Sequence, residues 1–296
     1  MAGSDLDMET LRRWVGRRQE DEDVISARQA RLMAATVGCA EPSRFVTGMA
    51  LPALWHWIYF LEGLPTKELG RDGHPARGGF LPPVPLSNRM WAGGRIEMPQ
   101  PIVIGSTVRR RSSVLRVEHK QGRRGDLVFV TVLHELLSQD DTLLLREEHD
   151  IVYTSQTTRT TSANAAVRHA DAAPACLAGP RVVPDTVMLF RYSALTFNGH
   201  RIHYDADYCR RVEGYDDLVV HGPLNATLLA NHAEAMSGRR LQRFEYRLLA
   251  PAILGATLTV SASAAADGLM TLAMLLDDGT PCAEAVATPA PVETMP

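Results

Sequence analysis

A short internal repeat is the feature that most constrains how this chain can fold. The segment PIVIGSTV at residues 101–108 recurs as PAILGATL at residues 251–258, with Pro, Gly and Thr at the same spacing. Each copy precedes strand-like segments that are separated by D-D or D-G turns. The repeat therefore predicts two copies of one fold. The length of 296 residues accommodates them, because a typical domain has about 150 residues.

Each copy has a candidate buried helix and a set of candidate strands. Residues 49–62 (MALPALWHWIYFLE) are nearly all apolar and precede a Gly/Pro-rich stretch, which predicts a long buried helix. Residues 222–237 are assigned the same part in the second copy. Alternating patterns predict three antiparallel strands between residues 102 and 153, and three more between residues 257 and 289. These elements indicate an α+β class.

The boundary between the copies is predicted in a segment of small polar residues. We expect an N-terminal repeat at 1–155, a linker at 156–180 and a C-terminal repeat at 181–296. Residues 5–37 are interpreted as two amphipathic helices, with Asp21 or Asp23 capping the second. Residues 70–94 are so rich in Gly and Pro that we expect a long loop, which covers the mouth of the site or faces the other repeat.

Composition excludes several classes of partner. The balance of 31 basic and 34 acidic residues gives a net charge of −3, so no global positive field attracts nucleic acid or an anionic membrane. No stretch approaches the ~18 apolar residues that cross a bilayer, and no secretory signal is recognised, which predicts a cytoplasmic protein. The four cysteines are scattered and read as free thiols: Cys39, Cys176, Cys209 and Cys282.

Polar side chains concentrate between residues 198 and 205. His203 lies five residues after Asn198, so an irregular turn lets the imidazole and the amide converge on one small molecule or water. A lone histidine is more often structural, but the density of polar groups here favours a catalytic site. The polar residues of this stretch are Asn198, His200, Arg201, His203, Tyr204 and Asp205.

The pair His200/His203 is also compatible with zinc. A catalytic zinc needs a third protein ligand, and neither Asp205 nor His221 stands at a recognisable ligand spacing. We therefore predict no metal. The lack of a phosphate loop or dinucleotide fingerprint predicts no cofactor.

The sequence His221-Gly222-Pro223 precedes the apolar segment 222–237 and predicts a helix start, because Pro is favoured in the first helical turn. Free backbone N–H groups at such a start, including that of Gly222, can hold an oxyanion. A plain helix start is the commoner interpretation of this pattern. Gly222 gains functional weight from the neighbouring histidines.

The stretch YSALTFNGHRIHYD at 192–205 resembles the hydratase-2 signature of the MaoC-like hotdog enzymes. In that signature an Asp five residues before a His activates water, and the glycine of an H-G-x-L helix start binds the thioester oxygen. His203 matches the family histidine and Gly222 the family glycine, whereas Asn198 stands where the Asp would be.

Two further motifs, EGYDDLVVHGPL at 213–224 and RMWAGG at 89–94, extend the resemblance. They are most similar to the double-hotdog branch that contains mesaconyl-C4-CoA hydratase, itaconyl-CoA hydratase and hydroxyacyl-thioester dehydratase type 2. The resemblance implies a double hotdog, in which each repeat has a long helix wrapped by an antiparallel sheet. Only the second repeat has the histidines, so we expect one active site per chain, with the first repeat structural and forming the acyl pocket.

The resemblance implies a hydro-lyase that interconverts an α,β-unsaturated acyl-CoA and its 3-hydroxyacyl-CoA. This reaction needs a base for water, a donor for the enolate-like oxygen and a proton for the α-carbon. We expect His203 to be the base and the Gly222 N–H to polarise the carbonyl. Asn198 can orient water but cannot take its proton, so His200 or Asp205 is expected to share the work if His203 does not carry it.

The arginines favour a short branched dicarboxylic acyl group, such as that of itaconyl-CoA or mesaconyl-C4-CoA, because guanidinium binds carboxylate bidentately. A salt bridge or a phosphate contact is an equally compatible role for them. The residues expected to bind substrate are Arg89, Trp91, Arg191, His200, Arg201, Tyr204 and His221.

Other functions stay open. A dehydratase acting on acyl carrier protein would need a basic patch, for which Arg109–Arg111 and Arg123–Arg124 are candidates. A hotdog protein that binds acyl-CoA without turnover fits Asn198 but not His203. A thioesterase is less favoured because no suitable nucleophile or carboxylate is evident. The chain is expected to be a monomer or a homodimer of double-hotdog chains.

Overall fold

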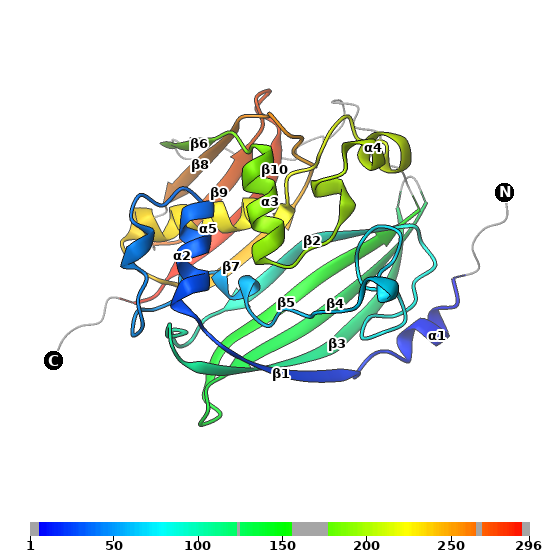
Figure 1. The fold of residues 1–296 in the computed structure, drawn as a ribbon, viewed down its shortest axis with the longest axis horizontal. Coiled ribbons are helices and arrows are strands. Elements are labelled where there is room, and N and C mark those ends of the chain that lie inside the picture. Colours follow the sequence, from blue (N-terminus) through cyan, green and yellow to red (C-terminus); the bar gives the residue numbers. More distant parts are fainter. Residues whose placement is uncertain (1–5, 123–124, 156–176, 265–267, 292–296) are drawn as a thin grey trace.

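The computed structural model describes residues 6–122, 125–155, 177–264 and 268–291. Ten strands form one sheet in the order β1-β3-β4-β5-β2-β7-β10-β9-β8-β6, and every neighbouring pair is antiparallel (Figure 1). The strands are β1 Arg18–Val24, β2 Asn88–Glu97, β3 Thr107–Gly122, β4 Gly125–Leu137, β5 Leu143–Thr154, β6 Leu177–Val182, β7 Leu241–Leu248, β8 Leu258–Ala264, β9 Met270–Leu275 and β10 Pro281–Pro289.

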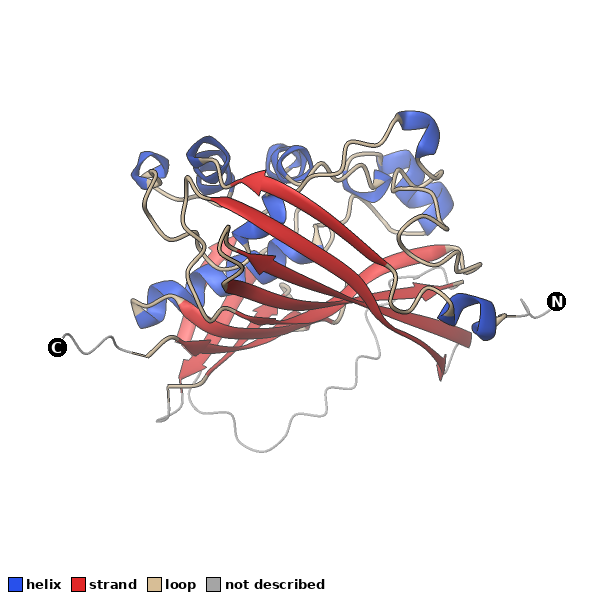
Figure 2. Cartoon of the chain, turned by 90° about the horizontal axis from the view of Figure 1, so that it is seen from below, coloured by secondary structure: helices blue, strands red, loops and turns tan. Residues whose placement is uncertain are grey.

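The first five strands in sheet order come from the N-terminal half, and β2 pairs with β7 to join the two halves. Helices α2, α3 and α5 lie on the same face of the twisted sheet (Figures 1 and 2). No described helix is long and apolar enough to cross a membrane. The helices are α1 Met8–Arg12, α2 Ala27–Thr36, α3 Thr186–Leu195, α4 Ala206–Tyr208 and α5 Gly222–Ser237.

The two copies of the sequence repeat occupy equivalent places. In each, the repeat segment forms an isolated antiparallel bridge to the chain that leads into the following helical segment, at Ala50–Val103 and at Val219–Ile253. Leu51 donates to the Ile102 carbonyl at 2.7 Å, and Val220 donates to that of Ala252 at 2.8 Å. The repeat is therefore confirmed, as are the strands predicted after each copy.

The helix predicted at 222–237 is confirmed as α5, but the one predicted at 49–62 is wrong. Only Trp55–Ile58 forms a turn of 3-10 helix, and Leu54 and Phe60 on either side have positive φ angles of 67° and 57°. The segment is buried, as its composition indicates. Its aromatic residues have low helix propensity, and their polar atoms bond to distant side chains, such as Trp55 Nε1 to Asn231 Oδ1 at 2.9 Å.

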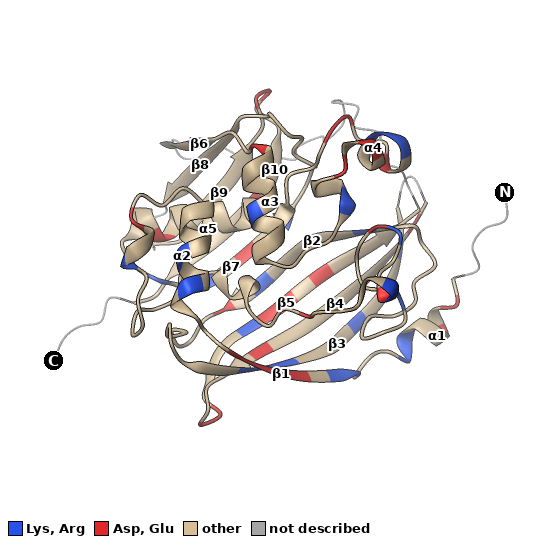
Figure 3. Ribbon diagram, viewed as in Figure 1, with Lys and Arg blue, Asp and Glu red and all other residues tan. Residues whose placement is uncertain are grey.

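The prediction of two amphipathic helices at 5–37 is partly wrong. Helix α1 is short, the acidic run forms strand β1, and α2 is capped by Ser26. None of the described helices is capped by Asp21 or Asp23, because both residues lie in β1, which pairs with the basic part of β3 (Figure 3). Opposite charges across strands stabilise this pairing, as at Arg111 Nε and Glu20 Oε1, 3.2 Å apart.

The expected loop at 70–94 is shorter than predicted, because β2 begins at Asn88 and includes the RMWAGG motif. The prediction that the loop faces the other repeat is confirmed, since the Arg201 amide donates to the Asp72 carbonyl at 2.9 Å. Residues 156–176 of the expected linker lie outside the described residues, and residues from 177 form β6. Cys39, Cys209 and Cys282 are free thiols, whereas Cys176 is not described.

Candidate active site

A cavity of about 640 Å³ lies between the two repeats. The first repeat supplies aromatic walls from the irregular segment around Trp57 and from Trp91 on β2. The second repeat supplies Asn198, His203 and Gly222. The cavity is mainly apolar with a few polar groups converging on it, as small-molecule sites are.

His203 ends a short 3-10 turn, Arg201–His203, and its ring is buried at the cavity wall. Its Nδ1 lies 2.7 Å from the Val219 carbonyl oxygen. Because a carbonyl only accepts, Nδ1 carries the proton and Nε2 is left as an acceptor. Burial lowers the pKa of His203 to about 4, so the ring is neutral near pH 7 and able to take a proton.

Gly222 is the first residue of α5, next to Pro223. Among the described residues its amide N–H donates to no protein acceptor, and the residue lines the cavity. The positive end of a 16-residue helix dipole therefore faces the cavity with a free donor. A Cβ at this position would lie 2.3 Å from Leu248 Cδ1, so packing against Leu248 favours glycine.

Asn198 lies in the turn between α3 and His203, after Phe197, whose φ is +48°. Its Oδ1 accepts the backbone N–H of His200 at 3.0 Å. The side-chain oxygen thus stabilises the turn that carries the histidines. Its NH₂ group can only donate, so Asn198 can orient a water molecule or an oxyanion but cannot accept water's proton.

Four histidines form a row along the site: His74, His200, His203 and His221. Their ring centroids are 4.1, 5.5 and 3.6 Å apart in that order. Burial lowers the pKa of each, and that of His200 falls to about 2. His221 lies behind His203 and shares a hydrogen bond of 2.8 Å with Ser193 Oγ. His74 was not predicted, although it stands in the Gly/Pro-rich loop whose packing against the second repeat was expected.

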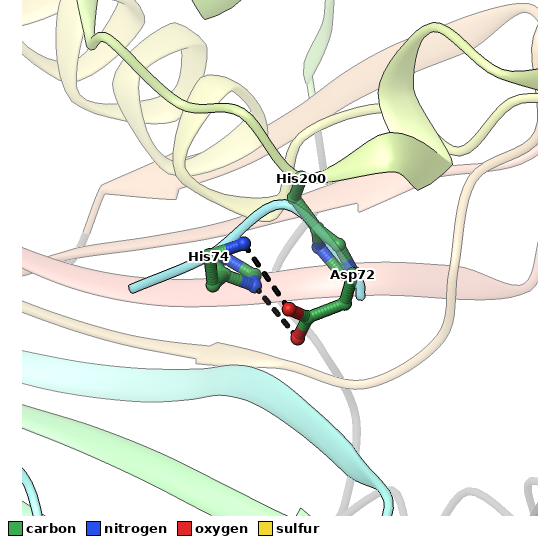
Figure 4. Close-up of side chains that lie close together, drawn as sticks. All are labelled: Asp72, His74 and His200. Carbon is green, nitrogen blue, oxygen red and sulfur yellow. Dashed lines mark hydrogen bonds and ion pairs between the residues drawn. The ribbon is translucent and has the colours of Figure 1, made fainter. Parts of the chain in front are cut away.

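His74 is paired with Asp72 and lies beside His200 (Figure 4). Among the described residues, Asp72, His74 and His200 form one group whose possible ligand atoms lie within 4.8 Å of one another, as a metal site would require. Both carboxylate oxygens of Asp72 are already bonded, one to the His74 amide at 3.1 Å and one to Nδ1 at 3.2 Å. The charge of Arg89 acts on all three groups and disfavours a bound cation. The geometry therefore favours an acid/base group over a metal site.

The expected substrate-binding residues fall into two sets. Arg89, Trp91 and His200 line the cavity. Arg201 is ion-paired with Asp205 at 2.7 Å, and neither lines the cavity. Three others also lie off the cavity lining: exposed Arg191 on α3, Tyr204, whose hydroxyl donates to the Gly199 carbonyl, and His221 behind His203.

A buried polar floor in the first repeat was missed by the sequence reasoning. Glu147 accepts hydrogen bonds from His56 Nε2 at 2.9 Å and from Trp57 Nε1 at 3.0 Å. His134 is its cross-strand partner on β4, and His149 on the same face of β5 stacks on Trp91 at 3.8 Å. The available signal was the run of five consecutive polar residues at 146–150 within a predicted strand, because successive residues of a strand point to opposite faces and some of these must face inward. All six of these side chains line the cavity.

The structure resembles solved double-hotdog proteins. A MaoC-like dehydratase superposes with a TM-score of 0.69 at 16% identity, over 95% of this chain and 100% of that one. A Mycobacterium tuberculosis protein described as having a double hotdog fold gives a TM-score of 0.57 at 14% identity, over 92% and 95% of the two chains. The chain therefore has the double-hotdog fold, as predicted.

The sequence comparisons narrow this class. The family model of hydroxyacyl-thioester dehydratase type 2 matches residues 54–254. The chain is 45% identical over 240 residues to the mesaconyl-C(4)-CoA hydratase of Chloroflexus aurantiacus, covering 80% of this chain and 83% of that protein. It is 25% identical over 241 residues to the mitochondrial hydroxyacyl-thioester dehydratase type 2 of Schizosaccharomyces pombe, covering 71% and 76%. The chain belongs to the hydroxyacyl-thioester dehydratase type 2 family, which confirms the prediction of a hydro-lyase.

Proposed function

We propose that this protein hydrates a short branched dicarboxylic enoyl-CoA, of the mesaconyl-C4-CoA or itaconyl-CoA type, to the 3-hydroxyacyl-CoA. The observation that carries the proposal is one cavity that joins a neutral histidine and a free helix-start amide to the Arg89 guanidinium. The 45% identity to a mesaconyl-C(4)-CoA hydratase supports the choice of substrate. Coenzyme A is part of the substrate, and no separate cofactor is proposed.

The chemistry follows from the two groups at the second repeat. His203 Nε2 takes a proton from water as the water oxygen attacks C3 of the enoyl group, since Nδ1 is held by the Val219 carbonyl. The Gly222 N–H stabilises the enolate oxygen of the thioester as the double bond shifts. Asn198 orients the water through its NH₂ group. The catalytic residues of the proposed site are thus Asn198, His203 and Gly222.

Arg89 is the residue best placed to hold the distal carboxylate. It lines the cavity from β2, opposite Tyr153 on β5, and makes no ion pair with a carboxylate among the described residues. Burial lowers the pKa of His74, and the nearby positive charge of Arg89 adds to that shift. An anionic acyl group would offer this guanidinium a carboxylate to bind, and the planar guanidinium is suited to it.

The first repeat then serves as the acyl pocket and the second as the catalytic repeat. The wall formed by Trp57 and Trp91, whose rings are 5.0 Å apart, accommodates the carbon chain. A carrier-protein substrate is less favoured, because the candidate basic patch is already neutralised. Arg109–Arg111 form ion pairs with Glu20 and Asp21 on β1. Arg123 and Arg124 lie outside the described residues.

Absorbance at the enoyl-thioester band tests the proposal. The purified protein is mixed with mesaconyl-C4-CoA, itaconyl-CoA, crotonyl-CoA and a longer enoyl-CoA. Rapid loss of absorbance with the two dicarboxylic substrates alone is expected. Loss with the alkyl substrates instead would assign a fatty-acid role, and loss with none would favour acyl-CoA binding without turnover.

A further inference from the structure

The loop that carries Asp72 and His74 packs closely against the turn at residues 198–203 of the other repeat, here named the catalytic turn. Gly73 has a φ of 86°, and a Cβ there would lie only 1.9 Å from the Gly199 carbonyl oxygen. The Arg201 amide donates to the Asp72 carbonyl at 2.9 Å. The two loops therefore approach so closely that only glycine fits between them, and this contact brings His74 to the cavity wall.

Asp72 and His74 form a carboxylate–imidazole pair. Asp72 Oδ2 lies 3.2 Å from His74 Nδ1, and Oδ1 accepts the His74 backbone N–H at 3.1 Å. Burial alone would raise the pKa of Asp72, but the hydrogen bonds and charge of His74 hold it well below its ordinary value. The ionised carboxylate fixes the proton on Nδ1, orients the ring and stabilises the imidazolium. Burial and the charges of Arg89 and Arg77 lower the pKa of His74, and the hydrogen bond and charge of Asp72 oppose that shift.

The other histidines of the row lack this arrangement. His203 bonds to the Val219 carbonyl and His221 shares its hydrogen bond with Ser193. Within the part of the chain that the structure describes, no carboxylate is hydrogen-bonded to the His200 imidazole, and burial lowers the pKa of His200 to about 2. His74 is therefore the histidine of the row that is best able to carry a positive charge during the reaction.

We propose that His74, held by Asp72, is a second acid/base residue of the hydratase site, supplied by the first repeat where Asn198 provides no carboxylate. The inference rests on the proposed function and adds a residue to it. His74 is the catalytic member of the pair because it lines the cavity. Asp72 is a positioning residue that acts through His74.

The proposed step balances one proton given and one proton taken. As the water oxygen bonds to C3, its proton moves to His203 Nε2, and the electron pair of the double bond passes to the thioester oxygen as an enolate. The carbonyl then re-forms while the imidazolium of His74 delivers a proton to C2. The proton on His203 returns to His74 across His200, whose ring lies between them at 5.5 and 4.1 Å. The net change is the addition of one water molecule.

The test compares Asp72→Asn and His74→Gln with the wild type in the hydration of mesaconyl-C4-CoA across pH. The wild type is expected to give a bell-shaped kcat profile, because His203 must be neutral and His74 charged. His74→Gln should lose about 100-fold or more in kcat with little change in KM, and the alkaline limb should disappear. Asp72→Asn should move the alkaline limb to lower pH by about one unit, because the imidazolium loses its carboxylate.

The matched control is Asp126→Asn, which disrupts the exposed His119–Asp126 pair, 2.7 Å apart and away from the cavity. Affinity for succinyl-CoA, a saturated dicarboxylic thioester that cannot react, reports whether each variant keeps its fold and site. If Asp72 and His74 had only a structural role, both variants would have a lower kcat but the two limbs of the pH profile would stay where they are in the wild type. That result would overturn the inference. Activity of the wild type that is lost on chelation and restored by Zn²⁺ would overturn it too, in favour of a metal at this cluster.

The two proposals fail in different ways. A wild-type protein that hydrates none of the enoyl-CoA panel removes the proposed function itself. A wild type that is active, together with a His74→Gln variant within about threefold of it, removes only the second acid/base residue.

Discussion

The two repeats share a frame but differ in what fills it. In the second repeat the sheet wraps the 16-residue helix α5, and the start of that helix faces the cavity. In the first repeat the equivalent segment is an irregular aromatic chain with one 3-10 turn, and polar side chains from β4 and β5 lie beneath it. One copy of the fold thus keeps a regular helix whose start faces the cavity, whereas the other has an irregular aromatic segment that lines the same cavity.

The largest expected effect concerns the second repeat alone. His203→Ala should lower kcat by at least about 100-fold, because it removes the general base of the proposed mechanism. The measurement is steady-state hydration of mesaconyl-C4-CoA, with succinyl-CoA affinity as the check on folding. A loss of only a few-fold would place the base elsewhere, and the contrast between the repeats would weaken.

The helix start of the second repeat can be tested by removing one N–H group. Gly222→Pro deletes the donor, and the position suits proline because it is the first helical residue and His221 before it is extended, with φ −60° and ψ 124°. Gly222→Ala is the matched control, since it introduces the same Cβ beside Leu248 but keeps the N–H. Relative to the alanine variant, kcat of the proline variant should fall by about 100- to 1000-fold. Equal activities would show that the amide binds no oxyanion.

Substitution of Arg89 tests whether the first repeat determines which acyl group is accepted. Arg89→Gln should lower kcat/KM for mesaconyl-C4-CoA by about 10- to 100-fold, the worth of a charge-assisted hydrogen bond, while crotonyl-CoA turnover changes little. Arg211→Gln, at a side chain that is 78% exposed, controls for the loss of a positive charge. An equal loss with both substrates would mean that Arg89 holds the coenzyme or the fold rather than the distal carboxylate.

Buried histidines of both repeats should make the folded protein less stable at acid pH. Burial lowers the pKa of His134 to about 3 and those of His149 and His203 to about 4. Between these values and 6.5 the unfolded chain binds more protons than the folded one, so stability falls as the pH falls through this range. We expect the free energy of unfolding to drop by at least about 3 kcal/mol between pH 7 and pH 4.

Chemical denaturation across pH measures this loss. His134→Gln should flatten the pH dependence while leaving hydration within about tenfold of the wild type, because His134 belongs to the floor and not to the reacting groups. A pH dependence unchanged by His134→Gln would mean that this histidine is not buried in neutral form.

The sequence predicts the second repeat better than the first, for a physical reason. A helix start with Gly222 and Pro223, and histidines within a few positions of each other, are local patterns that sequence spacing reveals. The floor of Glu147, His134 and Trp57 joins residues that are far apart in sequence, and only the register of β4 and β5 brings them together. Apolar composition correctly predicted burial of 49–62 but not its conformation.

The approach of Asp72 and His74 to the catalytic turn was likewise beyond local reasoning. The Gly/Pro-rich loop predicted an irregular segment that faces the other repeat, and this is confirmed. Which of its side chains reach the site depends on the contact of Gly73 with Gly199, across the boundary between the repeats. Such a contact leaves no periodic signal in either segment.

The most direct test of a single active site shared between the repeats is a structure of the His203→Ala variant with mesaconyl-C4-CoA bound. The account predicts the thioester oxygen within hydrogen-bond distance of the Gly222 amide, C3 facing position 203, and the distal carboxylate at Arg89 beyond the tryptophan wall of the first repeat. A thioester bound away from Gly222, or an acyl group that does not enter the first repeat, would contradict it.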